Sequence, residues 1–390
     1  MKNKLFNICN LYTFLWIIMN VKFIVYESNF ISVAAYVIIV AISLYYAAKC
    51  YASKNNPDFI KAYNVLFAVL CIYGAINMVV ADVDTTYKHI PTDFYLQNVV
   101  KSMLPFYAFY SFAKDGYINR KWICVFCGIF IVLSIGQYFV KQDVVLSTID
   151  ASEGEITNNY GYLFVALLPL VIFYKKMPVK FFFLSICAFF IVSSMKRGAN
   201  LSLAIMLLIL IGDTVKAKGT KKWFTLFFTA VILYVGYFYI VHLLESNAYF
   251  VQRIDDTMEG NSSNRDYLYS YYWRMYWDDS SFLEYVIGRG ADGTIHTGHN
   301  FAHNDWLEIL INQGMFGIVL FGLFWLSYFK LWKKTDKNEI KLVLALSLSS
   351  LFLKTFFSMS INEMSIYSTF TMAIGMAAYK NESVTQKIIT

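Results

Sequence analysis

The chain has 390 residues, of which 58% are hydrophobic, 19% aromatic and 15% charged, and its formal net charge is +7. A soluble domain contains about 25% charged residues, so this composition excludes a water-soluble globular protein. The positive charge is explained by membrane orientation and does not indicate nucleic-acid binding.

Apolar runs of roughly 17–25 residues predict membrane-spanning helices, because a helix of that length crosses the hydrocarbon core. The sequence therefore predicts an all-α fold, a polytopic transmembrane helical bundle that forms one transmembrane domain over residues 1–390. The first run is expected to be an uncleaved span, because no small-residue cleavage site follows it. We expect about twelve spans, at 5–21, 30–48, 60–81, 97–113, 122–140, 160–174, 178–195, 199–212, 222–244, 306–329, 341–358 and 363–379.

The positions of lysine and arginine predict the orientation of these spans. If the N-terminus is cytoplasmic, the inner loops contain 22 of the 33 basic residues and 6 of the 26 acidic residues. An inverted topology would conflict with this asymmetry, so we expect both termini in the cytoplasm. The six cysteines all lie in or beside apolar runs, and no disulfide framework is expected.

One large loop, residues 245–305, lies between the ninth and tenth predicted spans, on the outer face. It is rich in Tyr, Trp, Asp, Asn and Ser, and we expect it to carry short helices. Long ordered loops are usually functional. The aromatic residues from Tyr267 to Trp277 are typical of a helix in the lipid headgroup region, and they would also stack on sugar rings.

His303 and Asn304 lie where this loop enters the tenth span. A histidine there can exchange a proton near neutral pH or orient a hydroxyl group; the alternative is an interfacial histidine satisfied by water. Glu308, one helical turn after Asn304, would either orient His303 or cap a helix. Further along, Gly314 and Gly317 predict close helix packing.

Three histidines, His296, His299 and His303, have a spacing that would align metal ligands on a helix. Gly298 argues against a helix there, and no nearby cysteine completes a zinc site. We therefore expect neither a metal site nor another cofactor.

Basic side chains form the second group of candidate residues. Lys196 and Arg197 lie between two apolar spans on the outer side, where positive residues are disfavoured. The planar guanidinium suits phosphate oxygens, although the pair could also snorkel at a tight helix turn. Arg265 in the large loop is a further candidate, as is Lys354, which we expect to snorkel toward the outer surface. Two other loop arginines accompany Arg265, namely Arg274 and Arg289.

These elements resemble those of the O-antigen polymerase and ligase superfamily, which contains the Wzy-type O-antigen polymerases and the lipopolysaccharide O-antigen ligases. The family pattern is His-Asn, nine residues, then Gly-x-x-Gly, and here it spans His303 to Gly317. The sequence SSMKRGANLSL is similar to the upstream arginine element and places it at Arg197. A loop arginine, an aromatic stretch and a Gly-x-Gly are similar to Arg265 through Gly290. Many ligases continue with Thr-Arg, whereas this chain has Ile318-Val319, which favours a polymerase.

The resemblance implies a glycosyltransferase that polymerises undecaprenyl-diphosphate-linked repeat units at the periplasmic face of a bacterial inner membrane. It implies that Arg197 and Arg265 stabilise the leaving diphosphate without a metal, and that His303 orients or deprotonates the acceptor hydroxyl. Asn304 would fix this geometry, with inversion at the anomeric carbon. Further substrate contacts would come from Lys196, Arg274, Arg289 and Glu308. Membrane lipid and a chain-length regulator protein are the other candidate partners.

Three alternatives stay open. A ligase would transfer the glycan to the lipid A core. A flippase or other transporter of lipid-linked glycans would also have about twelve spans and cytoplasmic termini, but its charges should lie near the middle of the membrane. A scaffold without catalysis would not require Arg197 and His303 to converge.

Overall fold

The computed structural model describes residues 7–20, 29–80, 90–149, 160–194, 196–216, 220–246, 251, 255, 265–296, 300–336 and 338–359. These residues form helices, turns and loops and no strands, so the predicted all-α class is confirmed for them. Six helices are long and apolar enough to cross a membrane: Phe30–Ala52, Asp58–Val80, Arg120–Val140, Arg197–Lys216, Asp305–Lys334 and Glu339–Phe357. The chain is thus a multi-pass membrane protein, whereas the total of about twelve spans stays a prediction. The predicted span 363–379 lies outside the described residues.

The first part of the chain forms α1 (Ile8–Asn20), α2 (Asn29–Ala52), α3 (Asp58–Val80), α4 (Phe94–Met103), α5 (Pro105–Lys114) and α6 (Arg120–Ile149). It continues as α7 (Tyr160–Val171), α8 (Met177–Ser193), α9 (Arg197–Lys216) and α10 (Thr220–Ser246). The interval predicted as one span at 97–113 is therefore divided between α4 and α5. Pro105 begins the second helix, because proline is tolerated in a first turn, where its missing N–H has no partner to lose.

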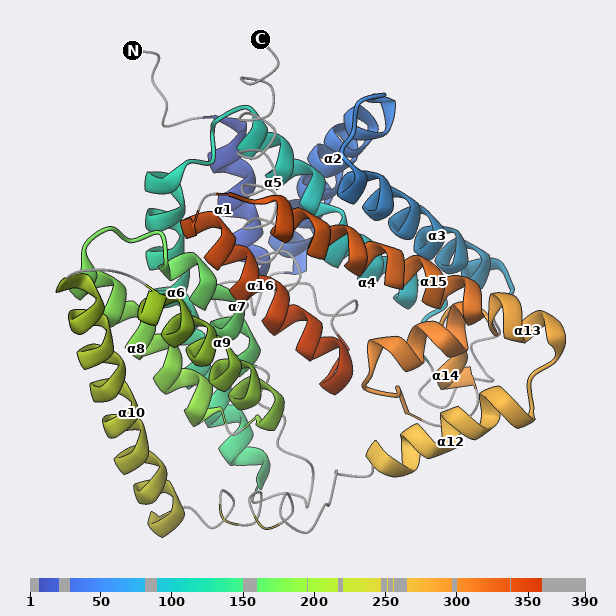
Figure 1. The fold of residues 1–390 in the computed structure, drawn as a ribbon. Coiled ribbons are helices and arrows are strands. Elements are labelled where there is room, and N and C mark those ends of the chain that lie inside the picture. Colours follow the sequence, from blue (N-terminus) through green and yellow to red (C-terminus); the bar gives the residue numbers. More distant parts are fainter. Residues whose placement is uncertain are drawn as a thin grey trace.

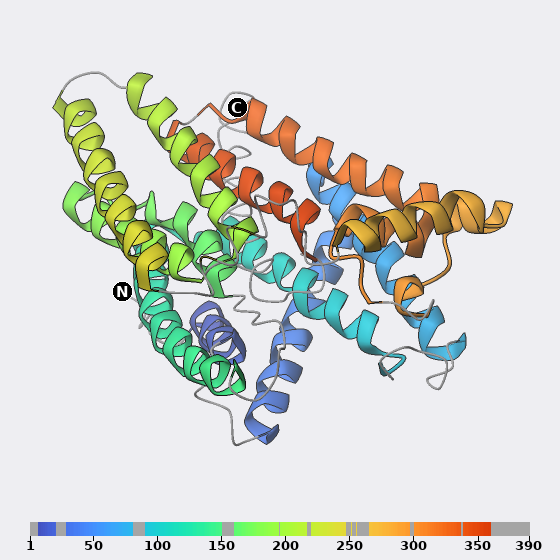
Figure 2. The same cartoon turned by 90° about the horizontal axis from the view of Figure 1, so that it is seen from below.

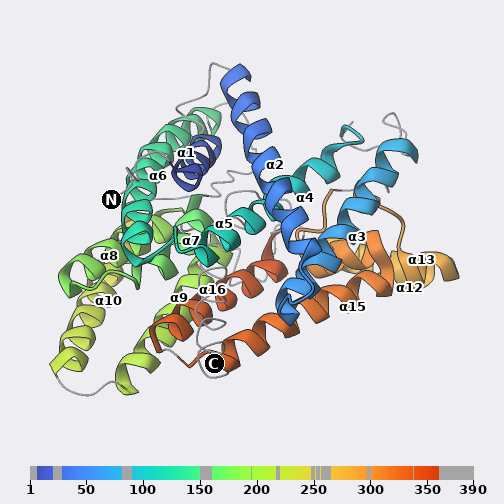
Figure 3. The same cartoon turned by 90° about the horizontal axis from the view of Figure 1, so that it is seen from above.

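Within the described residues, the interval predicted as the large loop forms three short helices, α12 (Arg265–Asp278), α13 (Phe282–Ile287) and α14 (Gly293–His296). They are followed by α15 (Asp305–Lys334) and α16 (Asn338–Phe357). Figure 1 shows the three short helices gathered beside the first part of α15, at one end of the bundle. From below, α12 lies alongside α15 (Figure 2), and from above α3 lies against α15 on another side (Figure 3).

The opposite end of the bundle is joined by a salt bridge. Arg120 Nη2 lies 2.8 Å from Glu339 Oε1, and Arg120 Nε donates to the Phe173 carbonyl at 2.7 Å. The starts of α6 and α16 therefore meet just beyond the end of α7. All three segments belong to the predicted inner side, so the pairing is consistent with the charge distribution along the sequence.

A kink divides α15 at Gly314, which has φ 63° and ψ −160°. Only glycine adopts this region readily. The kink frees the carbonyls of Ile311 and Asn312, and the backbone N–H groups of Arg289 and Gly290 donate to them at 2.8 and 3.0 Å. Beyond the kink, twenty residues remain, about 30 Å of helix, which matches the hydrocarbon thickness.

The two glycines of the Gly-x-x-Gly element therefore mainly make this kink possible. A Cβ atom at Gly314 would lie 2.6 Å from the Gly288 nitrogen and 2.7 Å from the Tyr285 carbonyl oxygen. A Cβ atom at Gly317 would overlap Gln313 and come within 2.9 Å of Ile309 Cγ2, in the same helix. The predicted close helix packing is confirmed at Gly314, whose neighbours belong to α13 and the residue after it, whereas the neighbours of Gly317 belong to the bent helix itself.

Candidate active site

Asn304 and His303 occupy the start of α15, as the sequence predicts. The Asn304 side-chain oxygen accepts hydrogen bonds from the backbone N–H groups of Trp306 and Leu307, at 2.9 and 3.1 Å, and so caps the helix. His303 has φ 53°, in the left-handed region that non-glycine residues adopt uncommonly, often at functional sites. The Tyr269 hydroxyl donates to the His303 carbonyl at 3.3 Å. The backbone at His303 is thus held by the cap on one side and by α12 on the other.

Glu308 fixes the segment that precedes His303. Its side chain is buried, and its two carboxylate oxygens accept from the Ala302 backbone N–H at 2.5 Å and from the Thr294 hydroxyl at 2.8 Å. These bonds tie α14 and residues 300–304 to the first turn of α15. Glu308 therefore positions the loop that carries His303, and the helix cap predicted as its alternative role belongs to Asn304.

The C-terminal turn of α16 connects α12 with the start of α15. Arg265 Nη1 donates to the Phe357 carbonyl at 2.8 Å, and the Tyr269 hydroxyl donates to the Phe356 carbonyl at 3.2 Å. Trp306 also contacts this turn. Its indole N–H donates to Thr355 Oγ1 at 2.9 Å, and its ring stacks on the Phe356 ring with the ring centres 5.8 Å apart. The loop arginine and the histidine segment thus border the same helical turn.

The start of α9 reaches this turn from another side. Gly198, directly after Arg197, is so close to α16 that a Cβ atom there would lie 3.3 Å from the Phe357 Cβ. Arg197 is the first residue of α9, and a helix N-terminus favours anions. The Lys196 backbone N–H donates to Ser194 Oγ at 3.4 Å just before the helix. The structure therefore places the three segments that carry Arg197, Arg265 and His303 around one turn of α16.

Lys354 adds a basic residue to the same turn. Only 2% of it is exposed, and its ammonium group lies 5.0 Å from the centre of the Tyr162 ring, within the range of a cation–π contact. Tyr162 also contacts Gly198. The snorkelling predicted for Lys354 is wrong, because the side chain is buried against α7.

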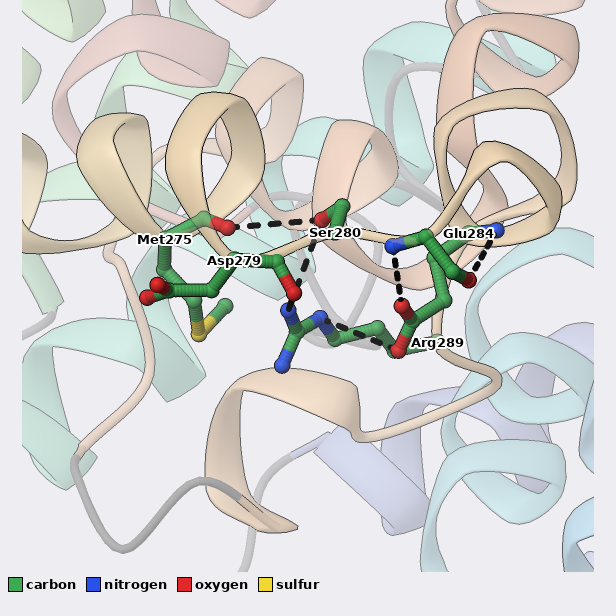
Figure 4. A network of polar contacts seen from close by, with 6 residues as sticks. Met275, Asp279, Ser280, Glu284 and Arg289 are labelled. Carbon is green, nitrogen blue, oxygen red and sulfur yellow. Dashed lines mark hydrogen bonds and ion pairs between the residues drawn. The ribbon is translucent and has the colours of Figure 1, made fainter.

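Arg289 lies at the other end of α12 from Arg265, about 20 Å away along a 14-residue helix. Its Nη2 donates to the Asp279 carbonyl at 3.0 Å and to Ser280 Oγ at 3.4 Å, and its Nε lies 3.5 Å from Glu284 Oε1 (Figure 4). These contacts secure the turn between α12 and α13. The structure does not bring Arg289 to the α16 turn, and its contact with substrate stays a prediction, as does that of the exposed Arg274.

An apolar groove of about 620 Å³ opens beside Asn304 between α12 and α15. Its walls include Trp273 and Tyr276 from α12 and Leu307, Leu310 and Ile318 from α15. Because Ile318 belongs to the part of α15 beyond the kink, the groove extends from the membrane-spanning helix to the capping residue. Its lining suits the hydrocarbon part of a lipid.

Tyr269 and Asp292 are among the groups in the loop region whose pKa values are shifted. Burial raises the pKa of the Tyr269 phenol, while Arg265 and a hydrogen bond with Asn304 oppose the rise. Burial also raises the pKa of Asp292 to about 7. Among the described residues no group of three or more His, Cys, Asp or Glu side chains is placed to hold a metal ion. His299 lies outside those residues, so the spacing of His296, His299 and His303 stays untested.

Sequence reasoning missed the role of Tyr269 and the burial of Lys354. Tyr269 is one of many aromatic residues in the loop, and only its two carbonyl partners distinguish it. Lys354 was expected at the outer surface, and its burial depends on contacts between α7, α9 and α16 that no local pattern encodes.

The fold and the site together define the class of protein: a multi-pass helical membrane protein in which a loop with short helices sets a histidine and basic residues around one helix end. Residues 182–322 match the family model described as O-antigen ligase. This match includes Arg197, Arg265, His303 and both glycines, and it confirms the resemblance to the O-antigen polymerase and ligase superfamily. No curated protein matches the chain.

Proposed function

We propose that the protein is a glycosyltransferase that polymerises undecaprenyl-diphosphate-linked oligosaccharide repeat units. The observation that carries this proposal is the meeting of three distant segments at the C-terminal turn of α16, where Arg265 donates to Phe357 and Tyr269 connects the same turn to His303. A scaffold without catalysis would not require these segments to meet.

The residues at this turn suit transfer from a lipid diphosphate. In the proposed reaction, the acceptor hydroxyl oxygen attacks the anomeric carbon from the side opposite the diphosphate, and the configuration inverts. His303 takes the hydroxyl proton. The anomeric carbon–oxygen bond to phosphate breaks, and its electron pair leaves with the diphosphate. Arg197 and Arg265, with the buried Lys354 behind them, stabilise the growing negative charge, so the reaction needs no metal ion.

The apolar groove supports entry of the carrier lipid from the membrane. We propose that the polyprenyl chain lies between α12 and the part of α15 beyond the kink, with its diphosphate near the α16 turn. Charged residues of the inner loops would then hold both termini in the cytoplasm, and the site would face the periplasm of a bacterial inner membrane. A chain-length regulator protein is a proposed partner.

An O-antigen ligase is the second candidate function, and the description of the matching family model favours it. Ile318-Val319, in place of the Thr-Arg found in many ligases, favours the polymerase. The two differ in product. A polymerase leaves a ladder of glycan on undecaprenyl diphosphate, whereas a ligase transfers glycan to the lipid A core.

The proposal is tested in cells that lack the endogenous gene and carry the wild-type or a variant protein. His303→Ala removes the proposed base and should lower polymer formation by about 10²–10⁴-fold. Arg197→Ala removes a charge that stabilises the leaving group and should lower it by about 10²–10³-fold. Membrane extracts are separated by size, with the glycan on lipid carrier and on lipid A core measured separately.

His242→Ala is the matched control, because His242 is an exposed histidine on α10, a helix that Figure 1 shows on the opposite side of the molecule from α12 and α14. All variants should reach the membrane at wild-type level. Normal chain length in His303→Ala or Arg197→Ala would refute the assigned roles. Translocation of lipid-linked units without new glycosidic bonds in the wild type would indicate a flippase.

A further inference from the structure

The helix α12 presents two chemically different grooves. One side borders the apolar groove with Trp273 and Tyr276. The other side borders a second groove of about 560 Å³, whose lining includes Asp266, Tyr271 and Arg274. Ser270 borders both. Because α12 begins at Arg265, which contacts the α16 turn, the second groove starts beside the candidate active site and leads away from it.

The second groove combines flat apolar rings with charged groups. Tyr267 and Tyr271, one turn apart, stack with their ring centres 6.2 Å from each other and an interplanar angle of 25°. Tyr267 is 58% exposed. Arg274 continues the same face one turn further, since positions i, i+4 and i+7 of a helix share a side. Asp266 and Asp279 lie at the two ends of the groove.

This combination suits carbohydrate. The C–H faces of sugar rings are apolar and pack on aromatic rings, while carboxylates accept from sugar hydroxyls and a guanidinium donates to ring and hydroxyl oxygens. From Asp266 to Asp279 the helix rises about 20 Å, which accommodates an oligosaccharide and exceeds a single ring. A hydrocarbon chain forms no favourable contacts with two carboxylates and an arginine. The apolar groove on the other side of α12 provides a better environment for it.

We infer that the groove formed by Asp266, Tyr267, Tyr271, Arg274 and Asp279 binds the oligosaccharide portion of the lipid-linked glycan beyond the reacting sugar. This inference rests on the proposed function and extends it, because α12 would separate the glycan on one side from the carrier lipid on the other. An enzyme that holds several sugars away from the reaction centre retains long chains better than short ones. The groove would therefore govern chain length more than the formation of the first bond.

Binding is measured with the His303→Ala protein in lipid nanodiscs, so that no turnover occurs. The probe is an oligosaccharide of two repeat units, released from the polymer of the wild-type cells, and saturation-transfer NMR reports its Kd. Tyr267→Ala/Tyr271→Ala should raise Kd about tenfold, the loss that follows from removing an aromatic anchor worth about 1.4 kcal/mol. Asp266→Asn, which keeps the shape of the side chain, provides a second variant and should weaken binding as well.

Tyr234→Ala/Tyr237→Ala is the matched control, because both tyrosines are exposed on α10, at 65% and 63%. It should leave Kd unchanged. In cells, the groove variants should still join two units but shorten the most abundant chain length, whereas His303→Ala abolishes joining.

Three results would overturn the inference: no binding to the His303→Ala protein, an unchanged Kd in both groove variants, or an equal loss in the α10 control. Failure of the proposed function is distinguishable from these, since it appears as unchanged polymer after deletion of the gene or in His303→Ala cells.

Discussion

The kink at Gly314 should be highly sensitive to the addition of a single methyl group. Alanine at φ 63° and ψ −160° is strained by about 1–3 kcal/mol. Its Cβ would also lie 2.6 Å from the Gly288 nitrogen, so the α13 loop must move. Moving that loop breaks the two hydrogen bonds from Arg289 and Gly290 to α15, each worth about 1 kcal/mol. Together these effects predict a destabilisation of about 3–5 kcal/mol for Gly314→Ala, a large part of a typical 5–15 kcal/mol.

Gly322→Ala is the matched control in the same helix, because nothing lies within 4 Å of a Cβ atom there. It should be neutral or stabilising by up to about 1 kcal/mol, the difference in helix propensity. The assay is the temperature at which half of the detergent-solubilised protein leaves the monodisperse peak in size-exclusion chromatography. A clear decrease for Gly314→Ala and none for Gly322→Ala is expected. Equal midpoints for the two variants would refute the account of the kink.

Three further predictions concern the loop region and the α16 turn. Tyr269→Phe removes the hydrogen bonds to the carbonyls of His303 and Phe356. A loss of about 1 kcal/mol in total should lower kcat about fivefold, and wild-type kcat would contradict its positioning role. Lys354→Met keeps the buried volume but removes the charge, and it should weaken binding of undecaprenyl diphosphate, measured by competition with lipid-linked substrate; an unchanged inhibition constant would exclude Lys354 from the anion site. Asp292 has a pKa raised by burial from 3.8 to about 7, so the folded state binds its proton more tightly than the unfolded state. The stability gained from this proton is complete below pH 3.8 and is lost as the pH rises through 7, a loss of about 4 kcal/mol at most in the free energy of unfolding. Asp292→Asn should therefore be more stable than the wild type at pH 8. A lower thermal midpoint of Asp292→Asn at pH 8 would contradict this sign.

Hydropathy predicted the long helices because apolar length is a local property that the bilayer imposes. The Arg120–Glu339 pair likewise joins segments that the charge distribution had placed on one side. Two local breaks in the helices were not predicted. The break before Pro105 lies within an apolar run, and the Gly314 kink has the same two-glycine spacing as ordinary helix packing.

The candidate site was predicted in part. His303 and Asn304 follow from a recognisable pattern at a helix start, and the cap formed by Asn304 is a local interaction. The meeting point at the α16 turn was not predicted. This turn contributes the backbone carbonyls of Phe356 and Phe357, and every residue has such a carbonyl, so the sequence does not distinguish these two positions. Glu308 had two candidate roles, and only the positions of Ala302 and Thr294 distinguish between them.

The most direct test of the account uses purified protein in liposomes with lipid-linked repeat units and counts the undecaprenyl diphosphate released per glycosidic bond formed. One released carrier per bond is expected for the wild type. The rate of undecaprenyl diphosphate release should fall by at least about 100-fold in Arg197→Ala, Arg265→Ala and His303→Ala. Only the two arginine variants should also show weaker inhibition by added undecaprenyl diphosphate. Release at the wild-type rate by any of the three variants would contradict a single site formed at the end of α16.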